Sequence, residues 1–125
     1  MKRNFDLIRR IMVHVEKVPP NHFVDEVSLQ YLSDEYGQEI VLQHVKLLME
    51  ENFLKGKIHQ NHNDVIDKIR ITEITWKGHD FIEAAQDDSI WNKAKETVLK
   101  PTVSITFSLL LEWLKQEAKI KLGLS

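Results

Sequence analysis

Several short stretches of this chain contain residue types that could perform acid–base or metal chemistry. In one of them, His79 and Asp80 are neighbours. Adjacent side chains on a helix point about 100° apart, so these two groups do not converge on one atom. We therefore interpret the stretch as the junction between a strand and a helix rather than as part of an active site.

The residues around that pair fit such a junction. Thr75 can accept hydrogen bonds from the free N–H groups at the start of the helix. Gly78 leaves space where the helix lies close to the preceding strands. Asp80 places negative charge in the first turns, where it is favoured. We expect Trp76 and Phe81 to fill the space beneath the helix.

The histidines do not predict a metal site. His59 and His62 are three residues apart, which places them on opposite faces of a strand unless a tight turn brings them together. Two histidines also need a third protein ligand. We expect both to be solvated at the tip of a hairpin. His44 falls on the inner side of a helix, where a histidine bonded to the backbone is the simpler interpretation.

A pair of carboxylates could suggest glycosidase chemistry. Asp87 and Asp88, however, are neighbours at a break between helices, so we expect this stretch to cap the next helix. Trp91 is then expected to pack that helix against the body of the protein. The four glycines do not cluster, so we do not expect a glycine-rich loop that binds phosphate. The sequence also has no nucleophile or metalloprotease motif. The sequence therefore predicts a protein that is not an enzyme and has no cofactor.

The composition indicates a globular protein of one domain over residues 1–125, with 42% hydrophobic and 29% charged residues. The chain has no cysteine, which excludes thiolate chemistry and suits a reducing cytoplasm. No apolar run approaches the roughly 18 residues of a membrane span. We expect a cytoplasmic protein with no membrane partner. The net charge of −2 does not by itself indicate nucleic-acid binding.

The spacing of apolar residues predicts the order of the elements. Helices are expected over about 4–18, 37–51, 76–87, 89–99 and 105–122, and strands over 54–60 and 65–75, joined by a turn at 61–64. Residues 23–34 alternate through Val27, Leu29 and Tyr31, which predicts a strand. A short helix from Ser28 to Tyr36 is the competing interpretation.

This order resembles a winged-helix domain: helix, short strand, helix, β-hairpin wing, followed by two or three C-terminal helices. The stretch HVKLLMEENFLKGK resembles the exit of a recognition helix into the wing, with Asn52 where glycine is commonest. The stretch EITWKGHDFIEAA is similar to the passage from the wing to the next helix. The resemblance implies an α+β class, with a winged-helix core over about 4–87 and a helical extension over about 88–125.

Nearly the whole chain also resembles a bacterial and phage family of unknown function that is common in prophage regions. The matching pieces are MKRNFDLIRRIM, HVKLLMEENFL, ITWKGHDFIEAAQDDSIWNKAK and the KLGL near the end. This resemblance implies a phage-related context and no particular activity.

Two basic regions could flank a DNA backbone: residues 2–18 at the first helix, with a charge of +3, and residues 55–70 of the hairpin, with a charge of +2. The helix at 37–51 carries a charge of −2, which opposes binding, although Gln43 could read adenine and Lys46 could contact guanine or phosphate. An ordinary solvated face is the alternative for the basic residues. The expected DNA contacts are Gln43, Lys46, Lys55, Lys57, Lys68 and Arg70.

The last helix carries more apolar residues than one docking face needs, and Leu109 and Trp113 form a second stripe. We expect these two at a protein interface, such as that of a homodimer formed through this helix. Two functions follow. The first is a winged-helix DNA-binding regulator. The second is a module on the same scaffold that binds a host or phage protein instead of double-stranded DNA.

Overall fold

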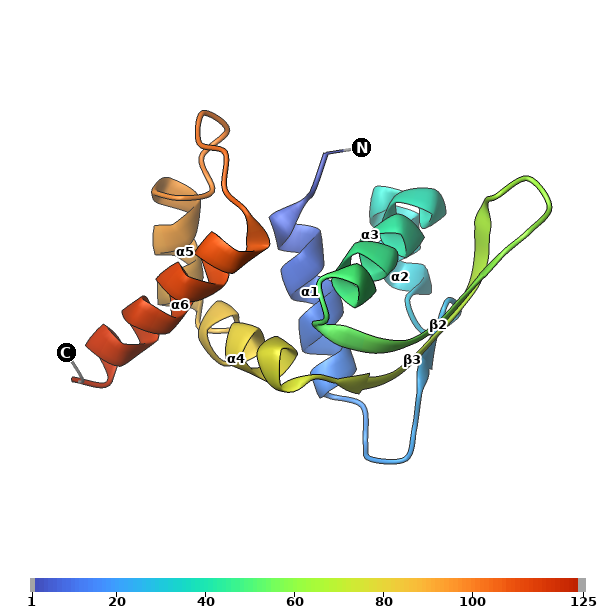
Figure 1. Cartoon of the computed structure of the whole chain (residues 1–125), viewed down its shortest axis with the longest axis horizontal. Coiled ribbons are helices and arrows are strands. Elements are labelled where there is room, and N and C mark those ends of the chain that lie inside the picture. The colour runs from blue at the N-terminus through green and yellow to red at the C-terminus, as the bar shows by residue number, and fades with distance from the viewer. Residues whose placement is uncertain (1, 124–125) are drawn as a thin grey trace. The chain divides into compact units, whose positions relative to one another are not determined.

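The computed structural model describes residues 2–123 and divides the chain into two compact units, Met1–Gly78 and His79–Ser125. The described residues form six α-helices and a three-stranded antiparallel sheet (Figure 1). In chain order the elements are α1 (Phe5–Glu16), β1 (Val24–Asp25), α2 (Gln30–Tyr36), α3 (Gln38–Glu50), β2 (Leu54–Gln60), β3 (Ile66–Ile74), α4 (Trp76–Ala85), α5 (Asp88–Glu96) and α6 (Phe107–Lys121). This confirms the α+β class. The single domain over 1–125, with a boundary near residue 87, stays a prediction.

Helix α1 begins where the sequence predicts. The Asn4 side chain accepts a hydrogen bond from the Leu7 amide at 3.1 Å, which satisfies one of the free N–H groups of the first turn. The helix ends at Glu16, before Pro19 and Pro20, which lack the N–H that a helix needs. Its buried residues recur at steps of three and four and form one apolar face: Leu7, Ile8, Ile11, Met12 and Val15.

The strand predicted over 23–34 is wrong for most of its length. Only Val24 and Asp25 pair with another strand, and Gln30–Tyr36 is helical, which agrees with the competing interpretation. Val27 is 71% exposed, whereas Leu29 and Leu32 are fully buried. The buried residues are thus spaced for a helix, and the apparent alternation in the sequence did not correspond to one buried face.

The sheet has the strand order β1-β3-β2. Ile58 pairs with Ile69, and Val24 pairs with Ile71. Ile69, Ile71 and Val24 are buried, so this side of the sheet is apolar, and α1 and α3 contact the strands. The antiparallel pairing of β2 with β3 confirms the predicted hairpin. The order α1-β1-α2-α3-β2-β3 is consistent with a winged-helix-like arrangement.

Helix α3 passes into the hairpin through a left-handed residue. Asn52 has φ 63°, a conformation that glycine adopts freely and that asparagine tolerates better than most residues. The Phe53 amide then donates to the Leu48 carbonyl at 2.9 Å, which closes the end of the helix. Asparagine at the position where glycine is commonest therefore serves the same backbone geometry.

The junction between β3 and α4 has the predicted cap and the predicted close approach. The Gly78 amide donates to Thr75 Oγ1 at 3.0 Å. A Cβ on Gly78 would lie 2.2 Å from the Phe53 carbonyl oxygen and 2.7 Å from Ile74 Cγ2, so any side chain there would clash. Gly78 thus lets the start of α4 lie against the beginning of the hairpin.

The prediction that Trp76 fills the space beneath α4 is wrong. The side chain is 89% exposed and does not fill the space beneath the helix, whereas Phe81 is fully buried. Trp76 precedes Gly78 by two residues, which is about 200° around a helix. Because the Gly78 side of α4 contacts Phe53 and Ile74, Trp76 points away from that contact and into solvent.

In the second unit, both remaining helices begin with side-chain caps. Asp87 accepts from the Ile90 amide at 3.0 Å, and Thr106 accepts from the Leu109 amide at 3.1 Å. Phe81 and Trp91 pack edge to face with ring centroids 6.4 Å apart. Trp91 is 2% exposed, as expected for a residue that packs its helix. The buried residues of α6 are Phe107, Leu110, Leu111 and Leu114.

Candidate nucleic-acid interface

The register of the hairpin places three of the predicted cations on one face. Lys57 is the partner of Arg70, and His59 is the partner of Lys68. Paired residues in an antiparallel sheet project to the same side, and residues two apart along a strand share that side. Lys57, Lys68 and Arg70 therefore lie together on the exposed face of the hairpin, opposite the apolar face that carries Ile69.

Arg70 is held by an aromatic ring. Its guanidinium carbon lies 4.2 Å from the centroid of the Phe23 ring, close enough for a cation–π contact. Phe23 is 48% exposed, so the stacked pair stays open to solvent. Asp25 on β1 is the strand partner of Arg70 and reduces the local positive charge. Sequence reasoning missed Phe23, although it lies next to the buried Val24 and faces outward for that reason.

Lys55 differs from the other cations of the hairpin. Its Nζ lies 3.7 Å from Glu73 Oε1, and both side chains are more than half exposed. A register irregularity between Lys55 and Gly56 interrupts the alternation along β2. Lys55 is therefore less available to an anionic partner than Lys57 or Lys68.

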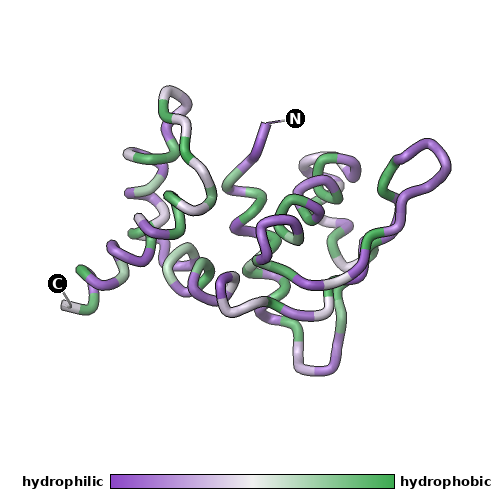
Figure 2. The backbone as a smooth tube through the Cα atoms, viewed as in Figure 1, coloured by the Kyte–Doolittle hydropathy of each residue, from purple (hydrophilic) through white to green (hydrophobic). Residues whose placement is uncertain are grey.

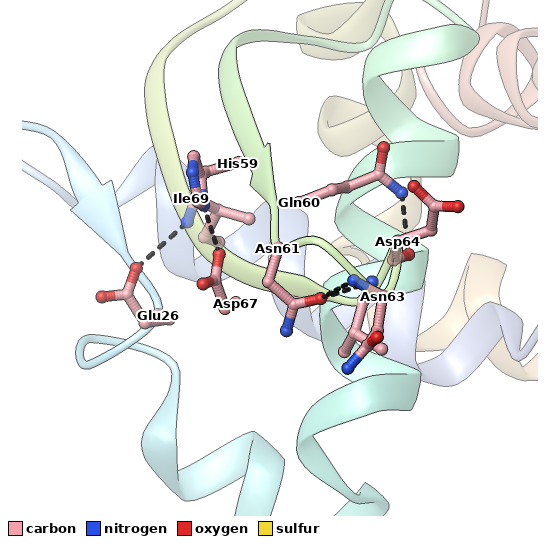
Figure 3. Close-up of polar contacts among 9 residues, drawn as sticks. Glu26, His59, Gln60, Asn61, Asn63, Asp64, Asp67 and Ile69 are labelled. Atoms are coloured by element: carbon pink, nitrogen blue, oxygen red, sulfur yellow. Dashed lines mark hydrogen bonds and ion pairs between the residues drawn. The ribbon is translucent and has the colours of Figure 1, made fainter.

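The tip of the hairpin is shaped by polar contacts (Figure 3). The Asn61 side chain accepts from the backbone amides of Asn63 at 2.8 Å and Val65 at 3.2 Å. Asp64, in the same turn, has φ 61°. Asparagine and aspartate suit such turns because they bond their own backbone and tolerate left-handed angles. In Figure 2 the end of the hairpin is mostly hydrophilic.

His59 binds an acidic neighbour rather than His62. Its Nδ1 lies 2.6 Å from Asp67 Oδ1, and the hydrogen bond from His59 holds the pKa of Asp67 below its ordinary value. On the other side of β3, the Ile69 amide donates to Glu26 at 3.0 Å (Figure 3). Among residues 2–123, no three histidine, aspartate or glutamate side chains are grouped to hold a metal ion.

Gln43 and Lys46 lie on a different element from the hairpin cations. Both are half-buried on α3, the helix that contacts β2 and β3 from the apolar side of the sheet. The other outward residues of α3 include the exposed Glu39 and Glu50. The six predicted DNA contacts therefore divide into a basic group on the hairpin and a mixed group on α3.

His44 is a structural residue, as the sequence predicts. It is fully buried, its Nδ1 bonds the Ile40 carbonyl at 2.8 Å, and its Nε2 accepts from the Asn4 amide at 2.8 Å. These two partners fit the neutral ring, with a hydrogen on Nδ1 and a lone pair on Nε2. Burial lowers the pKa of His44, and the bond to Ile40 offsets part of that effect.

The two residues predicted at a protein interface lie on α6. Leu109 is 61% exposed, and Trp113 is half-buried. His79 and Asp80 are both exposed on α4. Within residues 2–123, no helix is both long and apolar enough to cross a bilayer.

These features define a small α+β protein with an exposed basic hairpin. The chain belongs to the family of hypothetical proteins designated DUF2513, whose family model matches residues 2–104. It is also similar to an uncharacterized protein of Haemophilus influenzae, with 28% identity over 122 residues that cover 95% of this chain and 93% of the relative. No solved structure matches the chain.

Proposed function

We propose that this protein is a non-catalytic, cytoplasmic winged-helix module of phage or prophage type that binds double-stranded DNA. The observation that carries this proposal is the register of the hairpin, which groups Lys57, Lys68 and Arg70 on one exposed face. A wing of this kind contacts phosphates, because lysine and arginine displace the counterions that surround DNA.

Two further features support the proposal. The stacking of Arg70 on Phe23 restricts the guanidinium and leaves its planar N–H donors free to bind phosphate oxygens. On α3, the amide of Gln43 and the ammonium of Lys46 supply the donors that would read base edges. Glu39 and Glu50 on the same helix limit the affinity, so we expect moderate binding that depends strongly on salt.

The test is the salt dependence of duplex binding, measured by filter binding with a mixed-sequence duplex. The observed association constant of the wild type should fall steeply as salt rises. The double variant Lys57→Ala/Lys68→Ala should flatten the slope of log K against log salt by about 2, since each phosphate contact contributes about 0.9.

A matched control removes the same charge elsewhere. Lys100 and Lys115 are exposed in the second unit, so Lys100→Ala/Lys115→Ala should leave the slope unchanged. Equal slopes for the wild type and Lys57→Ala/Lys68→Ala would rule out the hairpin as the phosphate contact. A folded wild-type protein that does not bind the duplex even at low salt would overturn the proposed function.

The second candidate is a module that binds a host or phage protein, and the surface of α3 favours it. Ile40 is 38% exposed beside the exposed Glu39, so this helix offers an apolar side chain in an acidic setting. A basic peptide with one apolar anchor would complement that surface. NMR shifts confined to α3 on addition of such a peptide, with no shifts on addition of DNA, would favour this function over the first.

A further inference from the structure

Helix α6 has two apolar faces rather than one. Phe107, Leu110, Leu111 and Leu114 are buried and face inward. Leu109, Trp113 and Ile120 follow each other at steps of four and seven, which places them within about 40° of one another around the helix. Leu109 is 61% exposed and Ile120 is 56% exposed, so this outer stripe meets solvent in the single chain.

The charged residues on the two flanks of the outer stripe differ in whether they form ion pairs within the chain. Toward α5, Glu117 pairs with Lys93 at 2.8 Å, and Lys121 pairs with Asp87. Glu112 and Lys119 lie seven residues apart on the other flank of the outer stripe. Within the described residues 2–123, neither has an ion-pair partner.

We infer that the outer stripe of α6 binds the same stripe of a second copy of this chain, with the two helices antiparallel. In antiparallel pairs of helices, equivalent flanks face each other, so Glu112 of each copy meets Lys119 of the other. This contact occurs twice because of the two-fold symmetry. The same register places Leu109 of one copy beside Ile120 of the other at both ends of the stripe.

The charges disfavour the parallel alternative. In a parallel pair, each flank meets the opposite flank of the partner helix, about five residues further along. Glu112 would then face Glu117 of the second copy, which is acidic and already paired with Lys93. Like charges placed opposite each other are unfavourable, so the arrangement of charges selects the antiparallel orientation. This inference does not depend on DNA binding.

Sedimentation equilibrium without DNA tests the self-association. The wild type should reach twice the 14.7 kDa chain mass as its concentration rises through the micromolar range. The variant Leu109→Glu/Ile120→Glu should stay at 14.7 kDa. A wild type that remains at the single-chain mass at about 200 µM, far above a micromolar dissociation constant, would overturn the inference.

Charge reversal tests the contact itself in variants that keep the apolar stripe. Glu112→Lys alone and Lys119→Glu alone should each raise the dimer dissociation constant about tenfold or more, because each creates two like-charge contacts. The double variant Glu112→Lys/Lys119→Glu should restore the wild-type constant. Residues seven apart on one helix do not pair with each other, so the restoration requires a second copy.

Lys100→Glu is the control for a change of charge elsewhere and should have no effect on the dimer dissociation constant. Failure of the double variant to restore dimerisation would overturn the antiparallel contact.

Disulfide formation tests the orientation separately, because the native chain has no cysteine. A mixture of Leu109→Cys and Ile120→Cys chains should form a covalent dimer on mild oxidation. Neither variant should do so alone, because equivalent positions at the ends of the stripe are about 17 Å apart in the antiparallel pair. Cross-linking of each variant with itself, but not in the mixture, would show a parallel pair and overturn the inference.

Discussion

At the scale of single residues, the buried ring of His44 connects the start of α1 to α3, because its two nitrogens bond the Asn4 amide and the Ile40 carbonyl. His44 was expected on the inner side of its helix with a bond to the backbone, and its bond to the Ile40 carbonyl one turn earlier could be foreseen. Its second partner, the Asn4 amide, is 40 residues away and became apparent only in the folded chain. The same amino-terminal asparagine therefore caps α1 with its side chain and joins α1 to α3 with its backbone.

The buried His44 predicts a loss of stability in mild acid. Because its pKa in the folded protein lies below the ordinary value of 6.5, the unfolded chain binds the proton first as the pH falls. The contribution of His44 is complete above about pH 6.5 and declines as the pH drops toward the folded-state pKa. Protonation of Nε2 would also remove the acceptor for the Asn4 amide.

Urea denaturation at a series of pH values measures this effect. The variant His44→Gln keeps one donor and one acceptor without a titrating group, so its free energy of unfolding should depend less on pH below about 6.5. Asn63→Gln changes an exposed residue at the hairpin tip that has no titrating group, and it should retain the wild-type dependence. Identical pH profiles for the wild type and His44→Gln would contradict this role of the buried ring.

At the scale of elements, the junction after the hairpin follows from local sequence, but the direction of Trp76 does not. Thr75 and Gly78 act through the backbone within a few residues, and such effects can be foreseen from residue types. Which side of α4 contacts the hairpin is fixed by the position of Phe53 in space. Trp76 was therefore predicted to lie in the interior because it is large and apolar, whereas its side chain faces solvent.

Strand β1 also depends on contacts between distant residues, which local sequence does not predict. Two residues are too few to produce an alternating pattern, and their pairing with Arg70 and Ile71 spans more than 40 residues of sequence. The candidate site was also predictable only in part. The residue types of the hairpin indicated a basic region, whereas the stacking of Phe23 on Arg70 depends on the long-range pairing of β1.

Gly78→Ala should destabilise the protein, although alanine is the better helix former. The usual gain from this substitution in a helix is about 1 kcal/mol. Here the new Cβ would lie 2.2 Å from the backbone oxygen of Phe53, so the helix start must move. We expect a net loss of about 1–3 kcal/mol in the free energy of unfolding, measured by urea denaturation.

Asp80→Ala provides the comparison for Gly78→Ala, because it changes an exposed residue of the same helix. It should alter the free energy of unfolding by no more than about 0.5 kcal/mol. A Gly78→Ala variant as stable as the wild type would mean that α4 does not need this close approach.

At the scale of the whole molecule, the division into units after Gly78 indicates that stability need not be uniform along the chain. Trp91 is 2% exposed, and its loss to alanine removes a large buried side chain. We expect Trp91→Ala to cost about 3–5 kcal/mol. The loss of amide hydrogen-exchange protection should be concentrated in residues 79–123, with a smaller change in residues 2–78.

Leu42→Ala is the reciprocal variant, because Leu42 is fully buried in the first unit. It should lower protection mainly in residues 2–78. Equal loss of protection throughout the chain in both variants would show that the two units unfold together.

The three tryptophans have three different environments, so their fluorescence can report on three parts of the chain. Trp76 is 89% exposed and Trp91 is 2% exposed, with the half-buried Trp113 between them. Emission from Trp76 should therefore be red-shifted and readily quenched by iodide, whereas Trp91 should emit further to the blue and resist the quencher. Chains that keep a single tryptophan would let one instrument follow the end of the first unit, the interior of the second and the outer stripe of α6 separately.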